Sequence, residues 1–452
     1  MGAEHRRRDF LLTAFPTERA FCYALCASMG AAACFAWLGI ALAVWRPFPY
    51  WDAWRTVLMY QAWLEGHSTP WQFFLDHIIG QHNEHRLPFT EIGFWLDYRL
   101  FAGHGAITFP LTLIGHIALG ASIGVITSAR KPLIERCTWI LLGCAFSLAP
   151  IQIDNLTLTF HIQWFLSALL ALWLFATITG MAESPSWRRS TIACTLIFLS
   201  PFSSANGLAT VAIGLALAFA LPIKKPFRIA LTCAAVGSLA LFFLGYQFNP
   251  DSSKFHATLT STTGLYYFAK YFLALAGGAL ASQGIPTSCW AGALALLMLS
   301  NAVYFLHRHG DRDSATITLA ALSVAAAGWI FMTAIGRGGI GSEQALWSRF
   351  GTVVAVFWAS LLGCVWRMTY GRIQLFIAYT SIGVLAWMGE SGQIFIDQAK
   401  QRAALIDTTT ADLLAGKPDT SGVNPPQLVD FLRRHCLSVF SRNCDPRSGP
   451  PP

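Results

Sequence analysis

A run of ten residues, GQHNEHRLPF at positions 80–89, concentrates side chains that can do chemistry. It holds two imidazoles, an amide, a carboxylate and a guanidinium, on His82, Asn83, Glu84, His85 and Arg86. An arginine offers a planar fork that matches a phosphate. Imidazoles can donate hydrogen bonds and move protons near neutral pH. The run therefore favours chemistry on a phosphate-bearing substrate.

The spacing within this run excludes a zinc protease and leaves metal binding open. Zinc proteases need HEXXH or HXXEH, and the HNEH segment is one residue too short for the second motif. His82 and His85 could both ligate a metal from one helix, with Asp52 or Glu84 as a third ligand. The sequence identifies no cofactor. A divalent metal stays an alternative, with Asp52, His82 and Asp154 as its candidate ligands.

The chain that carries this run is predicted to be an all-α polytopic membrane protein. It has 452 residues, of which 54% are hydrophobic and 12% charged. A membrane-spanning helix needs about 20 mostly apolar residues, and such runs recur from residue 21 to residue 388. Barrel strands would alternate apolar and polar residues instead. We predict eleven spans, at 21–45, 107–128, 137–153, 164–182, 191–202, 207–223, 229–246, 290–306, 315–335, 351–366 and 373–388.

The placement of basic residues predicts which loops face the cytoplasm. Lysines and arginines occur between the spans at 130–136, 188–189, 224–228, 307–312 and 367–372. With eleven spans these loops all lie on one side, as the positive-inside rule requires of cytoplasmic loops. The N-terminus is then cytoplasmic and the C-terminus periplasmic, in a bacterial inner membrane. The net charge of +8 is explained by these loops, so we expect membrane lipids and no nucleic acid as partners.

One apolar stretch, residues 266–282, decides the number of spans. Counting it as a twelfth span would move the last two basic loops to the outer side. Its tyrosines suit the headgroup level, and Lys270 can reach the membrane surface with its amino group. We therefore predict an interfacial or re-entrant helix on the outer side and keep a twelfth span as the alternative.

This topology divides the chain into a transmembrane domain, residues 1–390, and a small periplasmic tail, residues 391–452. The transmembrane domain includes a long first periplasmic loop, residues 46–106. Cys436 and Cys444 are the two cysteines outside the apolar runs. Because a periplasmic tail lies in an oxidising compartment, this topology predicts a disulfide between them.

The first loop opens with an acidic residue next to the membrane. Pro47 and Pro49 end the first helix, and Asp52 follows within the aromatic segment YWDAW. Residues 53–64 and 71–79 are predicted to form short interfacial helices. The candidate catalytic groups of this loop are Asp52, Glu84 and His85, and its candidate substrate or phosphate ligands are His82, Asn83 and Arg86.

Three further outer loops offer polar side chains. The loop QIDNLTLTFHIQ contributes Asp154, Asn155 and Gln163. The turn PFSSANGL contributes Asn206, which could hydrogen-bond a sugar. The glycine-rich loop GRGGIGSEQALWSRF contributes Arg337 and Arg349. A cationic loop of this kind could hold a phosphate or a pyrophosphate.

With these features assembled, the architecture resembles the GT-C superfamily of membrane glycosyltransferases. The likeness covers roughly the first 250 residues and rests on the topology and on an acidic residue just after the first span, here Asp52. It implies an active site at the outer membrane face, a polyprenyl-phosphate-linked sugar donor and a glycan, lipid or protein acceptor. The superfamily usually pairs this acid with an adjacent one, whereas Ala53 follows Asp52. Either Asp52 acts alone, or Glu84 or Asp154 supplies the second carboxylate.

Two other classes of protein remain as alternatives. One is a transporter or flippase, or a polymerase or ligase, for lipid-linked saccharides; the other is a structural or assembly membrane protein. A transporter should place charged groups inside its spans near the membrane midplane, where His116 is the main ionisable residue of this chain. A transferase should place its acids at the outer surface beside the first span, as Asp52 is placed.

Overall fold

The structure, a computed structural model, describes residues 16–66, 69–247, 260–309, 313–417 and 424–443. These residues form helices almost throughout, and a short two-stranded hairpin is the exception among them. Nine helices in the described ranges are long and apolar enough to cross a membrane. The predicted all-α, multi-pass class is therefore confirmed at this level.

Nine of the eleven predicted spans correspond to these long helices. Four of the nine run together with short helical segments beside them, and the α7 span, for example, continues to Thr157. The main helices of the nine are α2 Pro16–Val44, α6 Thr108–Thr127, α7 Leu133–Leu148, α9 Ile162–Glu183, α12 Lys225–Phe243, α15 Gly284–His309, α16 Ser314–Arg337, α17 Gly351–Met368 and α18 Arg372–Leu414. The other two predicted spans are the shorter helices α10 (Trp187–Leu199) and α11 (Gly207–Ala220). With 13 and 14 residues, each is shorter than the ~20 residues of a full crossing.

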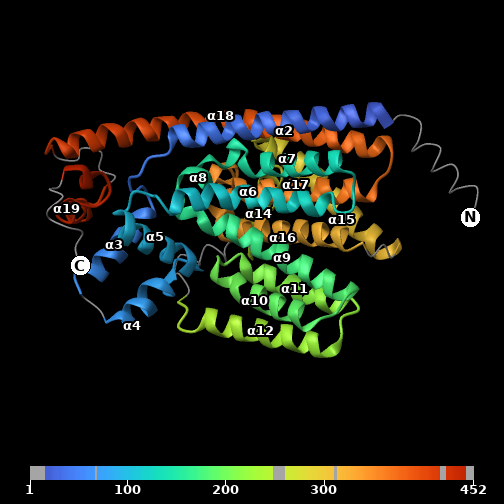
Figure 1. Cartoon of the computed structure of the whole chain (residues 1–452), viewed down its shortest axis with the longest axis horizontal. Coiled ribbons are helices and arrows are strands. Elements are labelled where there is room, and N and C mark those ends of the chain that lie inside the picture. Colours follow the sequence, from blue (N-terminus) through green and yellow to red (C-terminus); the bar gives the residue numbers. More distant parts are fainter. Residues whose placement is uncertain (1–15, 67–68, 248–259, 310–312, 418–423, 444–452) are drawn as a thin grey trace, which may run out of the picture.

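The short helices that follow α2 lie at one end of the helix bundle (Figure 1). At the other end Arg19 of α2 lies 2.8 Å from Glu135 of α7, and Arg367 of α17 lies 2.7 Å from Asp313. We call this the basic end; it comprises residues 128–136, 183–189, 221–228 and 367–374. The first polar loop lies at the opposite end, which we call the loop end. Residues 1–15 and 310–312, which carry the predicted cytoplasmic N-terminus and part of one basic loop, lie outside the described residues.

The first loop folds into a small helical layer at the loop end. Its elements are α3 Ala53–Leu64, α4 Pro70–Phe73, η1 Phe74–Ile78, β1 Gln81–His82, β2 His85–Arg86 and α5 Pro88–Phe101. Trp54 and Tyr60 of α3 pack with Tyr98 of α5 in a hydrophobic core separate from that of the bundle. Phe431 of α19 (Pro426–Arg434) belongs to the same core. The two predicted interfacial helices are thus present, the second as α4 followed by a π-helical turn.

The stretch predicted as interfacial or re-entrant forms α14 (Thr262–Ala276) and the 3₁₀ segment η6 (Gly278–Gln283). With 15 residues, α14 is not among the nine helices of span length in the described ranges. The carbonyl of its last residue, Ala276, accepts the indole N–H of Trp358 at 3.0 Å. Gln283 then donates to Glu390 at 3.1 Å. Because Glu390 lies halfway along α18, the segment returns toward the loop end instead of crossing the bundle.

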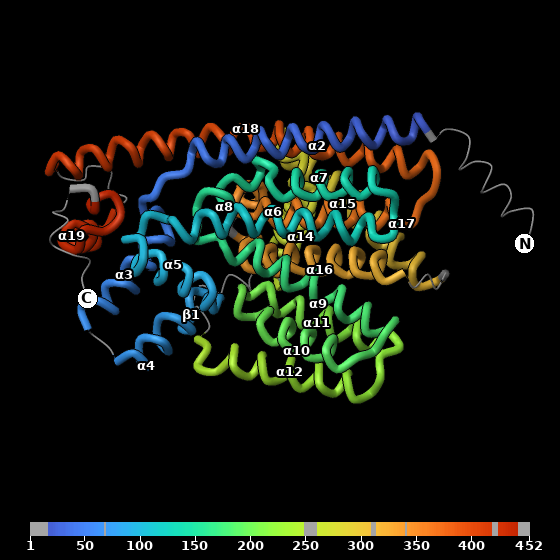
Figure 2. Tube along the Cα trace, in the orientation of Figure 1, coloured from blue at the N-terminus to red at the C-terminus, as the bar shows by residue number. Residues whose placement is uncertain are grey.

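Helix α18 does not end where the predicted transmembrane domain ends (Figure 2). It has 43 residues, which corresponds to about 65 Å at the rise of an α-helix, and the predicted boundary at residue 390 falls inside it. Beyond the bundle, Asp407 accepts from Arg46 at 2.7 Å and Arg402 lies 2.6 Å from Asp154. Cys436 is disulfide-bonded, and Cys444 of the predicted pair lies outside the described residues.

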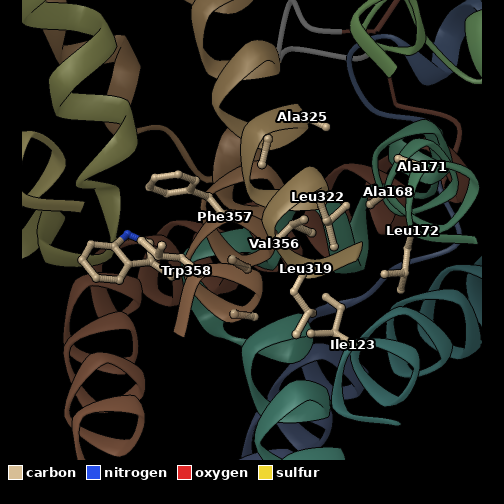
Figure 3. Close-up of a cluster of buried hydrophobic side chains, with 14 of the residues drawn as sticks. Ile123, Ala168, Ala171, Leu172, Leu319, Leu322, Ala325, Val356, Phe357 and Trp358 are labelled. Carbon is tan, nitrogen blue, oxygen red and sulfur yellow. The ribbon is translucent and has the colours of Figure 1, made fainter. Parts of the chain in front are cut away.

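The core of the bundle is apolar and closely packed (Figure 3). Leu322 of α16 and Val356 of α17 are buried in it. Helices α6 and α7 come into backbone contact at Gly120 and Gly143, where each glycine faces the backbone of the other. Small residues let membrane helices approach to backbone contact in this way.

This close approach predicts that Gly120→Ala destabilises the protein. An added Cβ would overlap the Gly143 carbonyl oxygen and lie 2.6 Å from the Cys144 Cα, and such overpacking costs about 1–3 kcal/mol. Gly39→Ala in α2 is the matched control, because its Cβ would meet no atom within 4 Å and alanine favours a helix. Thermal unfolding in detergent, followed by tryptophan fluorescence, should show a lower midpoint for Gly120→Ala alone. Equal midpoints would contradict the packing.

Candidate functional site

The predicted polar run forms a tight antiparallel hairpin. Gln81 pairs with Arg86, and His82 pairs with His85. The turn places Asn83 at a φ of 50°, a left-handed conformation that asparagine tolerates better than most residues. The hairpin thereby brings the two imidazoles across from each other.

Arg86 fastens this hairpin to the bundle. Its guanidinium donates to the carbonyl of Ile79 at 2.7 Å and to those of Phe242 and Leu244 at 2.8 and 2.5 Å, at the end of α12. All three nitrogens are therefore used to satisfy backbone carbonyls, and the side chain is buried. The prediction that Arg86 binds phosphate is corrected here: its role in this arrangement is structural.

His85 is held by a backbone amide of a second loop. Its Nδ1 accepts the N–H of Ala205 at 3.0 Å, in the turn that also contains the predicted ligand Asn206, which is buried. A neutral ring that accepts at Nδ1 carries its proton on Nε2. Burial lowers the pKa of His85, opposed by the charge of Glu84. His85 is therefore a neutral hydrogen-bond donor at pH 7.

His82 stands beside it in a similar state. Its ring packs edge-on against Phe160, 5.3 Å between centroids. Burial, with the charge of Arg55, lowers the pKa of His82 to about 4, while Asp52 opposes the shift. Both imidazoles of the hairpin are thus uncharged at neutral pH.

Asp52 is an exposed carboxylate among these rings. It precedes α3 as its N-cap and makes no side-chain capping bond; its carboxylate has no partner among the residues described. Its charge acts on His82, His85 and His161, so its carboxylate lies within electrostatic range of all three rings. Glu84 is exposed as well, and its backbone carbonyl accepts the Tyr246 hydroxyl at 3.3 Å.

The second outer loop is mainly a structural junction. Asp154 forms a 2.6 Å ion pair with Arg402 of α18. Asn155 donates to the Arg349 carbonyl at 3.0 Å and to Thr352 Oγ1 at 2.8 Å. Gln163 is buried near the start of α9. Asp154 is therefore not a free carboxylate that could act beside Asp52.

The predicted metal ligands do not form a metal site. Among the described residues, no group of three or more His, Cys, Asp or Glu side chains could hold a metal ion. The charge of Asp52 acts on His82, but Asp154 is engaged with Arg402. Asp52, His82 and Asp154 therefore do not form a set of ligands that fits a divalent metal.

Arg337 and Arg349 are two cations near this cluster that have no hydrogen-bond or ion-pair partner among the residues described. Their guanidinium carbons lie 5.7 and 5.1 Å from the ring centroid of Phe350, and Arg349 also lies 4.7 Å from that of Trp347. Neither guanidinium makes a hydrogen bond or an ion pair within the described chain, and the Arg349 Nε is buried. The aromatic rings hold both arginines in place and leave their donors available.

Sequence reasoning missed four residues that surround this cluster: His161, Tyr271, Arg402 and the ion-paired Glu91. Glu91 on α5 is buried and lies 3.3 Å from Arg55, which also donates to the Gln81 carbonyl at 3.4 Å. This pair links α3, α5 and the hairpin. Burial raises the pKa of Glu91 to about 7, opposed by Arg55. An acid inside a helix of the first loop was the available signal for Glu91; Arg402 is 248 residues from its partner Asp154, and no sequence signal connects them.

The carbonyl contacts of Arg86 predict that Arg86→Gln unfolds more readily than the wild type. Three buried carbonyls would compete for one amide, at a cost of about 3 kcal/mol. Arg349→Gln is the matched variant and should unfold like the wild type, because its guanidinium bonds no described residue. Thermal unfolding of both variants checks this. If Arg86→Gln unfolds at the wild-type temperature, Arg86 does not have the structural role assigned to it.

The raised pKa of Glu91 predicts how stability depends on pH. The folded protein binds a proton here more tightly than the unfolded chain, so this contribution to stability is complete below pH 4.5 and is lost as pH rises through about 7. Glu91→Gln keeps an acceptor for Arg55 and removes that loss. The variant should therefore gain on the order of 2 kcal/mol over wild type between pH 5 and pH 8. Unfolding midpoints that stay parallel across this range would contradict the assignment.

Neither a scan of protein-family models nor a search of curated proteins finds a match to this chain. The geometry of the loop end is accordingly the basis for a function. That geometry consists of a free carboxylate, neutral imidazoles and unpaired guanidinium groups beside an apolar helix bundle.

Proposed function

We propose that the protein is a membrane glycosyltransferase of GT-C type. It transfers a sugar from a polyprenyl-linked phosphate donor to an acceptor at the loop end. The observation that carries this proposal is the placement of Asp52, which has no side-chain partner in the described chain and lies directly after the first apolar helix among His82, His85 and His161.

In the proposed reaction Asp52 is the general base. Its carboxylate takes the proton from an acceptor hydroxyl as that oxygen bonds to the anomeric carbon of the sugar. The bond from the anomeric carbon to the phosphate oxygen breaks, and its electron pair leaves with the polyprenyl-linked phosphate. One displacement inverts the anomeric configuration.

The neutral state of the imidazoles suits this reaction. A protonated histidine beside Asp52 would form an ion pair and weaken the base. A neutral His85 instead offers its Nε2–H as a hydrogen-bond donor. The unpaired Arg337 and Arg349 would stabilise the negative charge that develops on the leaving phosphate.

Asp52 acts without a second acid in this scheme. Asp154 is neutralised by Arg402 at 2.6 Å. Glu84 is exposed in the hairpin turn, and its charge acts on His85 and on Tyr246. We therefore assign Glu84 to tuning the hairpin and Asp52 to the proton transfer.

The distribution of charge disfavours the transporter alternative. In α2, α6, α7, α9, α12, α15, α16 and α17, every described Asp, Glu, Lys and Arg lies in the first or last turn. His116 lies inside α6, where its Nδ1 is 2.9 Å from the Thr112 carbonyl and its Nε2 is 3.4 Å from Thr352 Oγ1. These bonds give His116 a packing role, whereas transport sites carry ionised groups at the midplane.

The proposal includes an orientation in the membrane. The basic end faces the cytoplasm by the positive-inside rule, which puts the loop end in the periplasm of a bacterial inner membrane. The polyprenyl chain remains in the lipid, and a glycan, lipid or protein acceptor approaches from the periplasm.

The role of Asp52 predicts that Asp52→Asn loses transfer activity. Removal of a general base lowers the rate about 10²–10⁴-fold. The protein in lipid nanodiscs would be supplied with synthetic polyprenyl-phosphate and polyprenyl-diphosphate hexoses and with envelope extract as acceptor, and release of the free carrier lipid would be measured. Asp76→Asn, an exposed acid of the same loop, is the matched control and should keep wild-type activity.

Two results would contradict this assignment. If Asp52→Asn keeps wild-type activity, Asp52 is not the general base. If the wild type releases no carrier lipid from any of the donors, the protein is not a glycosyltransferase of this type.

A further inference from the structure

The two unpaired arginines form a built cationic site. Phe350 lies between α16 and α17 at the loop end, and both guanidinium groups lie within cation–π distance of its ring, at 5.7 and 5.1 Å. Arg349 stands on Trp347 as well, at 4.7 Å. Such stacking fixes the plane of a guanidinium and leaves its edge free to donate.

Tyr271 of α14 adds a third donor to this site. The side chain is fully buried and its hydroxyl has no hydrogen-bond partner among the described residues. The charges of Arg337 and Arg349 both act on it, so it lies close to the two cations. A buried hydroxyl without a partner is unfavourable, and a bound acceptor would remove that cost.

No acidic side chain of the described ranges forms an ion pair with either arginine. Arg337 and Arg349 repel each other, and the acids whose charges reach Arg349 are Asp52 and Asp154. Asp154 is already paired with Arg402, and Asp52 is an exposed residue. Two neighbouring cations that lack an ion-pair partner favour a ligand that carries more than one negative charge.

We infer that the donor is a polyprenyl diphosphate saccharide, whose two phosphates bind Arg337 and Arg349. This inference rests on the proposed function and names its substrate class. A saccharide diphosphate diester carries one negative charge on each phosphate, so each phosphate can take one guanidinium. A monophosphate diester would leave one arginine unpaired.

The same site serves the bond-breaking step. When the bond between the anomeric carbon and the diphosphate oxygen breaks, the electron pair stays on the diphosphate and adds to its negative charge. Arg337, Arg349 and the Tyr271 hydroxyl then stabilise the leaving group more strongly than the bound donor. The acceptor proton goes to Asp52.

The neighbourhood of the site suits a lipid-linked diphosphate more than a soluble one. Phe268 and Phe272 of α14 pack against Phe331 of α16, with centroids 5.3 and 6.1 Å apart. Tyr266 and Phe331 remain largely exposed on the apolar surface of the bundle. A prenyl chain leaving the diphosphate would meet this aromatic surface.

The test is a binding measurement that does not depend on transfer. The full-length protein in phosphatidylcholine nanodiscs would be titrated with farnesyl diphosphate, farnesyl phosphate and inorganic pyrophosphate, followed by tryptophan fluorescence and calorimetry. Farnesyl diphosphate should bind at least about tenfold more tightly than either of the other two, because only it offers both the charge and the chain.

Variants test whether the two arginines cause the preference for farnesyl diphosphate over farnesyl phosphate. Arg337→Gln and Arg349→Gln should each weaken farnesyl diphosphate binding about tenfold or more and bring it down to the level of farnesyl phosphate. Tyr271→Phe should weaken it less. Arg372→Gln, which removes an exposed cation at the basic end, is the matched control and should bind like the wild type. Unchanged unfolding midpoints show that the variants are folded.

The possible contrary results distinguish the diphosphate site, the lipid carrier and the proposed glycosyltransferase from one another. Equal binding of farnesyl phosphate and farnesyl diphosphate, or normal binding by both arginine variants, overturns the diphosphate site and leaves the glycosyltransferase standing. Pyrophosphate that binds as tightly as farnesyl diphosphate overturns the lipid carrier. Binding of neither prenyl compound by the wild type counts against the diphosphate site and against the proposed function together.

Discussion

The guanidinium of Arg86 joins the first polar loop to the helix bundle, and the geometry of the loop end depends on this junction. It takes two carbonyls at the end of α12 and one within the loop. A cation that satisfies three buried carbonyls can be removed only at a high cost. The hairpin it anchors then reaches the turn at Ala205, which orients His85. Without this anchor, the imidazoles and Asp52 would have no fixed relation to Arg337 and Arg349.

The bundle imposes a second constraint, which sorts polar groups to its ends. An apolar interior cannot hold unpaired charge, so the acids and bases of the spans pair at the basic end, as Arg367 does with Asp313 at 2.7 Å. At the loop end the pairing is incomplete. Arg402 neutralises Asp154, whereas Asp52 and the arginines beside Phe350 stay without partners in the described chain. These unpaired groups of both signs at the loop end mark the place where we expect a charged substrate to bind.

Prediction from the sequence succeeded where a local pattern decides the outcome. Apolar runs of sufficient length predicted the long apolar helices, of which nine lie in the described ranges. The interfacial or re-entrant placement of α14 stays a prediction, although α14 is shorter than those nine. Side-chain roles were harder, because residue type alone fits several partners. Arg86 suits a phosphate as well as carbonyls, and only the end of α12, far along the chain, settles which it contacts. Tyr271 belongs to no recognisable motif, and only the structure shows that it lies near Arg337.

We propose that the first loop, the turn at Ala205 and the loop before α17 form a single site for a prenyl-linked phosphate. Photo-crosslinking tests it most directly. A farnesyl diphosphate with a diazirine next to the diphosphate would be irradiated with the protein in nanodiscs, and the adducts located by mass spectrometry. The account predicts adducts within residues 50–54, 81–86 and 337–350. Adducts that fall at the basic end, or that spread evenly along the lipid-facing helices, would contradict it.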